Sequence, residues 1–537
     1  MAVDSETDKE VGLIETGADK LDLELRDKWW PRMKLAVIDV GYNSLKIVKY
    51  RVEPDGSVKA YGQLGVMARL GEGLERTGYL GKEPISRTIA ALNILREAAA
   101  IDSIKHILLI GTSPVREAAN HAEFIRQVRD ETGLDMKVLT GNEEALYALL
   151  GAARSVDAPT ALFFDLGGGS LELSYMENHR VKRILSLPLG ALKLTSNYAN
   201  RSGSFSRKDK AKMGEYISRL LPSKRELRIR GDATLVGMGG TVRAIARYEQ
   251  DVMNYPLNKV HNYSVDYSAI QRMSREFFQL DMSELAQLEA IGENRSQTIA
   301  AGTFVVKSLM KKFGFKRLVV STHGLRDGVL ADFLGRRAND PGVLTEKNEV
   351  ERLMIIPAAF SSPNRSLELL ECLVRNRVFD KRQKKILMMT MGMSQARELA
   401  EVDPGGLFGV MMSEDLPMSH EDQLLMSLSL VRDRKPRIAN WLVRRYGFLL
   451  SSKDAKSVRQ MGACLRLMEI LERSSANVSV AYSKGFRISI SDSEEAFPIN
   501  LARMAAEALS TSIKNPVSVT KAPKLREHAA AAVEAGR

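Results

Sequence analysis

The chain repeats one pattern, and this internal repeat constrains its fold more than any other feature of the sequence. Each copy has an apolar strand-like run, an aspartate at its end, a glycine turn with small polar residues, and a second strand-like run. The copies lie at residues 34–52 and 162–173, with Asp39 and Asp165 in equivalent places 126 residues apart. Such a repeat predicts two similar α/β lobes, each of which presents one acidic loop to a shared cleft.

The second copy has the chemistry of a phosphate site. Its three consecutive glycines, Gly167 to Gly169, let backbone N–H groups approach a ligand without side chains in the way. Asp165 beside them is suited to hold a metal ion that bridges to the phosphate. Strand alternation directs the leucines that follow to the core and Glu172 toward the ligand of the loop. Taken alone, the stretch is also compatible with an ordinary hairpin that has a glycine-rich turn.

Two charged residues between the copies are candidates for work in the cleft. Pro114 marks a helix start, which places Arg116 in a first turn beside a helix N-terminus that favours anions; a solvated arginine is the alternative. Thr140 and Glu143 have the spacing of a capping box, so Glu143 has a structural explanation. Glu144 is not needed for that cap. It is either a general base near the phosphate or a carboxylate that complements the helix dipole.

The rest of the chain adds weaker signals. Residues 234–241 combine a strand, a glycine turn and a helix start, and form a second candidate anion cradle. His323 lies in a loop that feeds a helix, and we interpret it as a loop or packing histidine rather than a catalyst. Beyond Gly335 the pattern is mostly helical, and a basic cluster between Arg375 and Lys385 is either a track for a polyanion or a solvated face.

Length and composition bound the architecture and the partners. A chain of 537 residues exceeds what one hydrophobic core usually serves. The net charge of +12, from 78 Lys and Arg against 66 Asp and Glu, favours a polyanionic partner but does not separate nucleic acid, polyphosphate and an acidic membrane surface. The two cysteines have no metal-ligand spacing, no apolar run is long enough to span a membrane, and the acidic N-terminus lacks the features of a signal peptide. We therefore expect a cytoplasmic protein.

Five motifs occur in register along the chain. They are Asp39-x-Gly41-x-Asn43-Ser44, Gly141-Asn142-Glu143-Glu144-Ala145, Asp165-x-Gly167-Gly168-Gly169-Ser170-x-Glu172, Gly237-x-Gly239-Gly240-Thr241 and Leu325-Arg326-Asp327-Gly328-Val329-Leu330. Together, over about residues 34–335, they resemble the exopolyphosphatase/guanosine pentaphosphatase family of the actin-like ATPase superfamily. The resemblance implies an α/β fold of two RNase H-like lobes with a cleft between them. It also implies Mg²⁺-dependent hydrolysis of the terminal phosphate of linear inorganic polyphosphate or of guanosine pentaphosphate, by a homodimer, with no membrane and no nucleic acid as partner.

The resemblance further implies roles for individual residues. In that family the second glutamate of the motif seen here as Asn142-Glu143-Glu144 positions or deprotonates the attacking water, which favours the general-base interpretation of Glu144. Glu172 joins it as a catalytic residue. From its own place at a helix start we expect Arg116 to be catalytic too, as a planar donor to the phosphoryl group. The expected metal ligands are Asp39, Asp165 and Glu172, and the expected phosphate-binding residues are Gly41, Asn43, Ser44, Gly167, Gly168, Gly169, Ser170, Gly239, Gly240 and Thr241.

The chain departs from the family pattern at a few positions. Tyr42 stands where a serine is usual, and we expect it to crowd the phosphate or to cap a shorter substrate. Leu171 replaces a common threonine, and Thr322-His323 replaces an Asp-Gly or similar pair. Two alternatives to an exopolyphosphatase therefore stay open. One is a guanosine pentaphosphate 5'-phosphohydrolase, and the other is a non-catalytic sensor of polyphosphate or of the nucleotide.

The C-terminal half resembles, more faintly, the helical domain of longer family members, which is related to HD phosphohydrolases. An HD metal site needs several histidines and an adjacent His-Asp pair, but past residue 340 the sequence has only His420 and His528 and no such pair. We therefore predict a degenerate HD domain with a structural or polyanion-guiding role. The predicted segments are a mobile tail (1–31), lobe I (32–155), lobe II (156–335), this helical domain (345–513) and a flexible tail (514–537).

Overall fold

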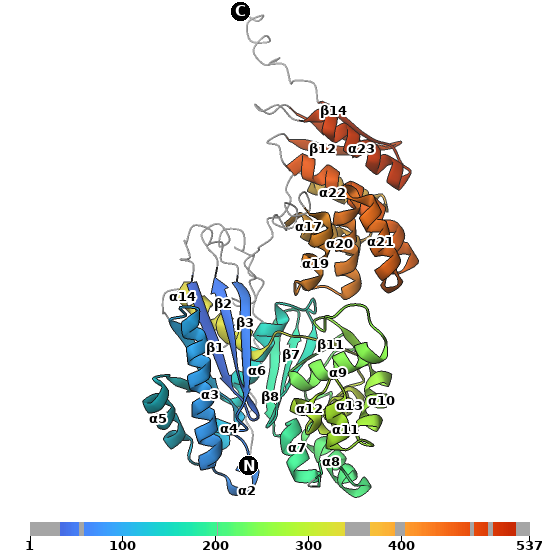
Figure 1. The fold of residues 1–537 in the computed structure, drawn as a ribbon. Coiled ribbons are helices and arrows are strands. Elements are labelled where there is room, and N and C mark those ends of the chain that lie inside the picture. The colour runs from blue at the N-terminus through green and yellow to red at the C-terminus, as the bar shows by residue number, and fades with distance from the viewer. Residues whose placement is uncertain are drawn as a thin grey trace, which may run out of the picture.

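Two α/β lobes lie side by side, and a mostly helical domain sits beyond them in the computed structural model (Figure 1). The structure describes residues 33–52, 58–200, 202–338, 366–392, 403–472, 477–491 and 498–521. Their strands form three sheets with the orders β3-β2-β1-β4-β5, β10-β11-β9-β6-β7-β8 and β12-β13-β14. The predicted N-terminal tail lies outside the described residues.

Lobe I is built on the first sheet. Its apolar runs form the central strands, where β1 pairs antiparallel with β2 and parallel with β4. The strands are β1 (Met33–Val40), β2 (Ser44–Val52), β3 (Val58–Met67), β4 (His106–Gly111) and β5 (Met136–Val138), and the helices are α2 (Leu74–Thr77), α3 (Lys82–Ile101), α4 (Ser113–Glu117), α5 (His121–Thr132) and α6 (Gly141–Ala153). The predicted capping box at the start of α6 is present, because Thr140 and Glu143 exchange both hydrogen bonds.

Lobe II is built on the second sheet. Alternation along its second strand places Leu171, Leu173 and Tyr175 in the core, as predicted. The strands are β6 (Ala161–Leu166), β7 (Leu171–Glu177), β8 (Arg180–Leu187), β9 (Thr234–Met238), β10 (Ser264–Asp266) and β11 (Arg317–Val320). The helices are α7 (Ala191–Tyr198), α8 (Arg207–Leu220), α9 (Gly240–Val252), α10 (Tyr267–Phe277), α11 (Met282–Gln287), α12 (Glu293–Ser296) and α13 (Ile299–Phe313).

The predicted repeat is visible in the backbone of the two hairpins. The Gly41 N–H donates to the Ser44 carbonyl over 3.2 Å, and the Gly167 N–H donates to the Ser170 carbonyl over 3.1 Å. Each hairpin then continues into an antiparallel pair of strands. The two loops are therefore structural equivalents, each at the strand end that carries its aspartate.

The last helix of the lobes, α14 (Leu325–Ala338), crosses back to lobe I. It packs along α6, and Val329 and Leu330 enter the core of the lobe I sheet. The two helices approach closely because both have glycine at the contact: a Cβ at Gly151 or at Gly328 would overlap backbone atoms of the segment that it faces. The prediction placed this segment in lobe II, up to residue 335, whereas its buried side chains pack in the core of lobe I.

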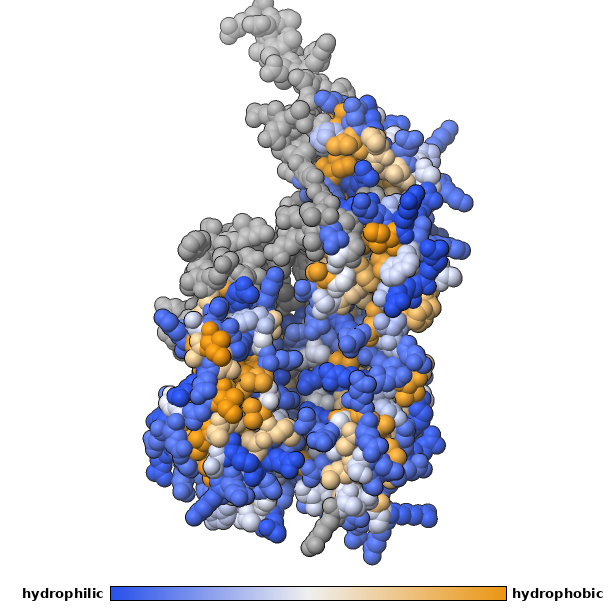
Figure 2. All heavy atoms as spheres, viewed as in Figure 1, coloured by the Kyte–Doolittle hydropathy of each residue, from blue (hydrophilic) through white to orange (hydrophobic). Residues whose placement is uncertain are grey.

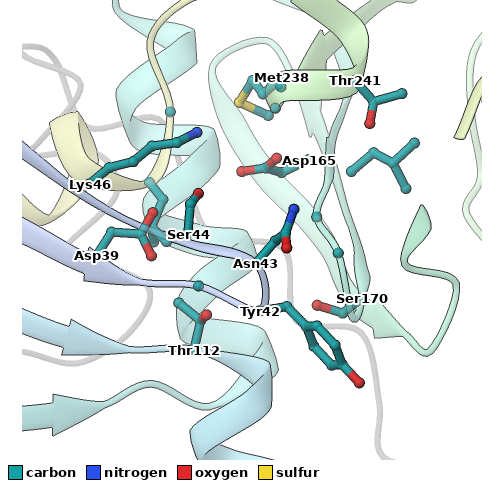
Figure 3. Close-up of a pocket in the computed structure, with 18 of the residues that line it drawn as sticks. Asp39, Tyr42, Asn43, Ser44, Lys46, Thr112, Asp165, Ser170, Met238 and Thr241 are labelled. Atoms are coloured by element: carbon teal, nitrogen blue, oxygen red, sulfur yellow. The ribbon is translucent and has the colours of Figure 1, made fainter. Parts of the chain in front are cut away.

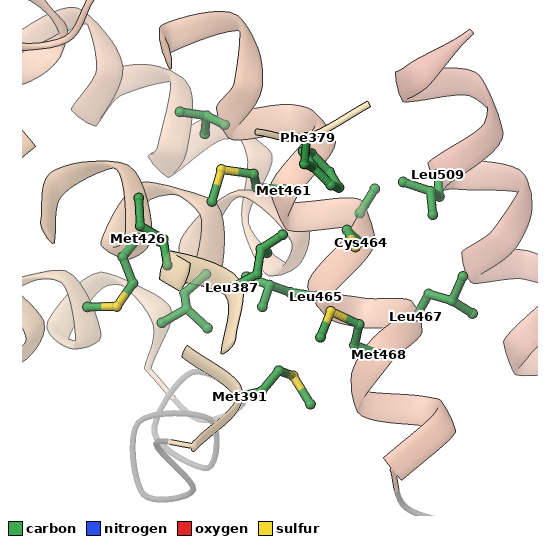
Figure 4. Close-up of a cluster of buried hydrophobic side chains, with 14 of the residues drawn as sticks. Phe379, Leu387, Met391, Met426, Met461, Cys464, Leu465, Leu467, Met468 and Leu509 are labelled. Atoms are coloured by element: carbon green, nitrogen blue, oxygen red, sulfur yellow. The ribbon is translucent and has the colours of Figure 1, made fainter. Parts of the chain in front are cut away.

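The C-terminal domain combines helices with a small sheet. Buried leucines and methionines fill its core around Cys464 (Figure 4). Its elements are α16 (Leu367–Arg375), α17 (Lys381–Gly392), α19 (Pro404–Ser413), α20 (His420–Arg434), α21 (Pro436–Tyr446), the 3-10 helix η1 (Gly447–Leu449), α22 (Ser452–Glu472), β12 (Val478–Tyr482), β13 (Phe486–Ile490), α23 (Ile499–Ile513) and β14 (Val517–Lys521).

The predicted tail from residue 514 is wrong in its first part. The alternating apolar residues of Val517–Lys521 pair parallel with β13 and form an edge of the small sheet. The rest of that predicted tail lies outside the described residues. No helix in the described part of the chain has both the length and the apolar character needed to cross a bilayer.

An apolar patch marks the outer face of lobe I (Figure 2). Val58, Leu64 and Met67 of β3 are each more than a third exposed. Strand β3 is an edge of its sheet, so its outer backbone groups have no neighbouring strand among the described residues.

Candidate active site

A cleft between the two lobes collects most of the predicted site residues. Its cavity volume is about 160 Å³. The predicted residues that line it are Asp39, Gly41, Asn43, Ser44, Glu144, Asp165, Gly167, Gly168, Ser170, Glu172, Gly239, Gly240 and Thr241. Two predicted residues, Arg116 and Gly169, lie just behind the lining. The topology explains the gathering, because the strand ends of both sheets and the helix starts that follow them meet at one place.

Four of the five carboxylates that line this cleft belong to the predicted site, and they come from both lobes. Asp39 and Asp165 end β1 and β6, and Glu172 pairs with Asp165 across the β6–β7 hairpin. Glu144 is the fourth residue of α6. Burial raises the pKa of Asp39, against the lowering effect of Arg326, whose Nη1 donates to Asp39 Oδ2 over 3.3 Å. Burial and the charge of Asp39 together raise the pKa of Asp165.

The pKa values of the two glutamates of the cleft are raised as well. Each is only 6% exposed. Burial and the nearby Asp165 raise the pKa of Glu172 to about 7, although the Ser186 hydroxyl donates to its Oε1 over 2.9 Å. Burial and the charge of Glu172 raise the pKa of Glu144 well above its ordinary value. A carboxylate with a pKa near neutrality is suited to take a proton from water at physiological pH.

Arg116 has a different place from the one we predicted. Its Nη1 donates to the Glu144 carboxylate and, over 2.7 Å, to the Leu139 carbonyl. The guanidinium therefore fixes the position of Glu144 instead of lining the cleft. Gly169 likewise supports the loop from behind, since a Cβ there would meet Ser113 and the ring of Tyr42.

Four basic side chains that we did not predict face the carboxylates. Lys46, Arg243, Arg295 and Arg326 all line the cleft. Burial, and then the charges of the three arginines, lower the pKa of Lys46 to about 7. Burial and the other two arginines lower the pKa of Arg243 to about 10. Cations that disfavour one another in a buried place are poised to bind a polyanion.

Figure 3 shows the Lys46 ammonium and the Asp165 carboxylate directed into the same space, with Asp39 and Ser44 beside it. The repeat contained the signal for Lys46. The position that faces Asp165 across its hairpin is Glu172, and the position that faces Asp39 is Lys46. Arg243 could have been predicted from its position. It is the fourth residue of α9, and Arg116, which we did predict, is the fourth residue of α4.

Tyr42 is one of the residues that line the cleft. Its side chain points away from Lys46 and Asp165 (Figure 3), and the residue is 6% exposed. The ring packs on Gly71 of lobe I and on Gly168 and Gly169 of lobe II, where a Cβ would overlap or crowd it. Its hydroxyl lies 3.4 Å from Glu75 Oε1. Tyr42 therefore fills the contact between the two loops and does not crowd the space between the charged groups.

His323 is more than a loop or packing histidine. It lines the cleft, and its ring lies between two carboxylates, Asp327 of α14 and Asp415 of the C-terminal domain. These two ion pairs, against the effect of burial, raise the pKa of His323 to about 10. No local pattern in the sequence indicates this contact, because Asp415 is distant in the chain.

Three residues of the basic cluster of the C-terminal domain have acidic partners. Arg382 bonds Asp422 and Asp454, and Lys384 lies 3.3 Å from Glu371. Lys385 bridges to lobe II, where its ammonium lies 2.5 Å from Asp157. These three side chains are engaged by carboxylates, and the choice between a polyanion track and a solvated face stays a prediction for the cluster as a whole.

With this geometry in view, comparison with known proteins decides the family. The sequence profile described as the Ppx/GppA phosphatase family matches residues 53–337, which is more than half of the chain. The chain belongs to this family. The prediction of a phosphate-hydrolysing enzyme is thereby confirmed.

Individual relatives agree with this placement. Exopolyphosphatase 2 of Mycobacterium tuberculosis is 26% identical over 319 residues, which cover 56% of this chain and 99% of the relative. Guanosine-5'-triphosphate,3'-diphosphate pyrophosphatase of Vibrio vulnificus is 25% identical over 306 residues, 57% of this chain and 60% of the relative. The crystal structure of an exopolyphosphatase from Cytophaga hutchinsonii, 20% identical, covers 56% of this chain and 98% of its own with a TM-score of 0.53.

These comparisons confirm the predicted Ppx/GppA fold of two actin-like lobes, with the helical domain following it. The family profile ends at residue 337, so it does not reach the C-terminal domain. The likeness of that domain to HD domains stays a prediction.

The cleft fits the magnesium ion that the Ppx/GppA resemblance implies. Mg²⁺ prefers carboxylate, phosphate and water oxygens, and it usually takes only one or two carboxylates from the protein. Asp39 and Asp165 are half-buried carboxylates, and the charge of Asp39 raises the pKa of Asp165, so a cation between them would relieve that repulsion. Asp39 and Asp165 are therefore the carboxylates that would hold it, and Glu172, which pairs with Asp165 across the hairpin, stays a predicted ligand.

Proposed function

We propose that the protein is an exopolyphosphatase that hydrolyses the terminal phosphate of linear inorganic polyphosphate with Mg²⁺. The observation that carries the proposal is the pairing of two opposite charge sets in one cleft. Four of the cleft's carboxylates suit metal binding and proton transfer, and four half-buried cations suit a substrate with many negative charges. The exopolyphosphatase relative, which aligns over nearly its whole length with the two lobes, supports the same interpretation.

The residues of the chain supply most of the proposed chemistry. Glu144 accepts a proton from a water molecule as the water oxygen attacks the terminal phosphorus, and the anhydride oxygen leaves on the opposite side. Arg116 keeps the Glu144 carboxylate in place through its hydrogen bond. Backbone N–H groups of the two hairpin loops hold the terminal phosphoryl oxygens. A bound Mg²⁺ ion would neutralise charge on the phosphoryl oxygens.

The basic side chains bind the phosphates that follow the terminal phosphate of the polyphosphate substrate. Lys46 and Arg243 reach the cleft from different lobes, so a substrate that contacts both holds the lobes together. Arg295 stacks on Gly240, where any Cβ would overlap its guanidinium, so this glycine is required for the place of the arginine.

A second candidate is hydrolysis of guanosine pentaphosphate, which the similarity to the Vibrio vulnificus pyrophosphatase supports. Both substrates present a terminal phosphate with further phosphates behind it. They differ in the bulky nucleoside, which a polyphosphate lacks.

The test is phosphate release from long-chain polyphosphate and from guanosine pentaphosphate, measured side by side with and without Mg²⁺. Release from polyphosphate that needs Mg²⁺ is the expected result. Release from the nucleotide alone would establish the second candidate. Binding of either compound without release would make the protein a sensor and would contradict both enzymatic proposals.

The remaining features of the proposal rest on the family resemblance. We propose a cytoplasmic homodimer, whose mass in solution light scattering would measure. We also propose that the C-terminal domain begins near residue 345 as a separate unit, which limited proteolysis would test.

A further inference from the structure

A second group of metal-binding side chains lies where lobe II meets the C-terminal domain. His261, in the loop before β10, and His323, in the loop after β11, converge on Asp415, which lies between α19 and α20. One ligand atom from each of the three lies within 4.8 Å of the others. We propose that this His₂Asp cluster is a binding site for a transition-metal ion such as Zn²⁺, separate from the magnesium site of the cleft.

In each histidine, the ring nitrogen that points away from the cluster has the kind of hydrogen-bond partner that is found in known metal centres. Nε2 of His261 lies 2.9 Å from the Ser155 carbonyl oxygen, which can only accept, so this nitrogen carries the hydrogen and Nδ1 has the free electron pair. Nδ1 of His323 lies 3.5 Å from a carboxylate oxygen of Asp327, which leaves Nε2 directed at Asp415. Metal-bound histidines almost always donate their second ring N–H to a carbonyl or a carboxylate.

The polar atoms of the histidines and the aspartate that face one another are not all hydrogen-bonded. His323 Nε2 is buried and, among the described residues, makes no hydrogen bond, although Asp415 Oδ2 lies 3.3 Å away. Asp415 Oδ2 also accepts the Thr322 hydroxyl over 2.9 Å, while Lys259 lies 3.3 Å from the other oxygen, Oδ1. Oδ2 is therefore the oxygen that faces the histidines.

The ligand chemistry selects the kind of ion. Two imidazoles and one carboxylate suit Zn²⁺ or a neighbouring transition metal with a fourth position for water, whereas Mg²⁺ prefers oxygen ligands alone. The ion would replace the Thr322 N–H, 3.2 Å away, as the partner of His261 Nδ1. The ion would link Asp415 of the C-terminal domain to the loop of His323. That loop leads into α14, whose Arg326 donates a hydrogen bond to Asp39 in the cleft.

A metal-free account of the same residues exists. A protonated His323 would bridge Asp327 and Asp415 by itself, with no need of an ion. Only a metal site would bind Zn²⁺ in the full-length protein, so a measurement of Zn²⁺ binding distinguishes the two arrangements.

The experiment uses the full chain without a histidine tag, stripped with a chelator and titrated with Zn²⁺ in a calorimeter and with Co²⁺ in a spectrophotometer. We expect one equivalent of Zn²⁺, a tetrahedral Co²⁺ spectrum, and a higher Tm with Zn²⁺. Asp415→Ala should weaken binding by at least about 100-fold, and Asp327→Asn, which removes only the carboxylate behind His323, by about 10–100-fold.

Two controls locate the ion. His179→Asn changes an exposed histidine in a turn with positive φ, where asparagine is well tolerated, and should leave Zn²⁺ binding unchanged. Asp39→Asn removes a cleft carboxylate and should also leave it unchanged. The proposal is overturned if the wild type shows no saturable Zn²⁺ binding, if Asp415→Ala binds as the wild type does, or if Asp39→Asn abolishes binding.

Discussion

Replacing Glu172 by glutamine is expected to stabilise the protein at pH 8 while removing its activity. Glu172 is 6% exposed, and its pKa is raised from 4.5 to about 7 by burial and by Asp165. A carboxyl group whose pKa is higher in the folded state holds its proton more tightly there. Its contribution to the free energy of unfolding is therefore full at low pH and is lost as the pH rises through about 7.

The size of this effect follows from the pKa change. A rise from 4.5 to about 7 corresponds to about 3 kcal/mol, most of which is lost between pH 5 and pH 8. Glutamine has the same shape and keeps an oxygen that can accept the Ser186 hydroxyl, but it carries no charge at pH 8. The variant should therefore be more stable than the wild type at pH 8 by up to about 3 kcal/mol, and by much less at pH 5.

The assay is urea unfolding of both proteins at several pH values from 5 to 8, followed by circular dichroism. Glu123→Gln, an exposed glutamate of α5, is the matched control and should follow the wild-type curve. If the Glu172→Gln curve runs parallel to the wild-type curve over this range, or lies below it at pH 8, the electrostatic account of the cleft is refuted.

Three further substitutions test separate parts of the structure. Arg243→Met should weaken polyphosphate binding by about 10–100-fold and reduce its salt dependence, whereas Arg225→Met, which changes an exposed arginine, should do neither in the same binding titration. Gly328→Ala should lower the free energy of unfolding by about 1–3 kcal/mol because its Cβ has no room, and Gly409→Ala, with open space in α19, should not lower it in the same denaturation assay. Tyr42→Ser should lower stability by about 3 kcal/mol but leave the choice between polyphosphate and nucleotide unchanged, and a change of substrate would show that the ring limits the cleft.

The repeated hairpins were predictable because each is specified locally. An apolar run, an aspartate and a glycine turn determine strand, loop and strand within a dozen residues, and the alternation that follows determines which side chains face the core. The amino-acid pattern alone therefore places Glu172 and the two aspartates in the cleft. Glu144 needed the family resemblance as well, because a glutamate in a first helical turn has an ordinary explanation in the helix dipole.

The four basic side chains of the cleft were not predicted, because tertiary structure determines that they lie together. Arg295 and Arg326 lie in helices whose sequences do not indicate which lobe they face. Lys46 could have been predicted, because the repeat pairs it with Asp39 as it pairs Glu172 with Asp165. The two positions were not recognised as equivalent because one is basic and the other is acidic.

Some elements of the fold also lacked a clear signal. Strand β3 contains two glycines and is mostly exposed, so no regular apolar alternation marks it. Helix α14 follows lobe II in the chain but packs on lobe I, and only the close approach at Gly151 and Gly328 explains that crossing.

The most direct test of the central claim is the turnover of Glu144→Gln. Glutamine keeps an oxygen for the Arg116 hydrogen bond but cannot take a proton from water at neutral pH. The rate constant for phosphate release from polyphosphate should fall by about 10²–10⁴-fold, while the dissociation constant for polyphosphate stays at the wild-type value. A variant that turns over at the wild-type rate, or that loses polyphosphate binding along with turnover, would contradict the assignment of Glu144 as the base in this cleft.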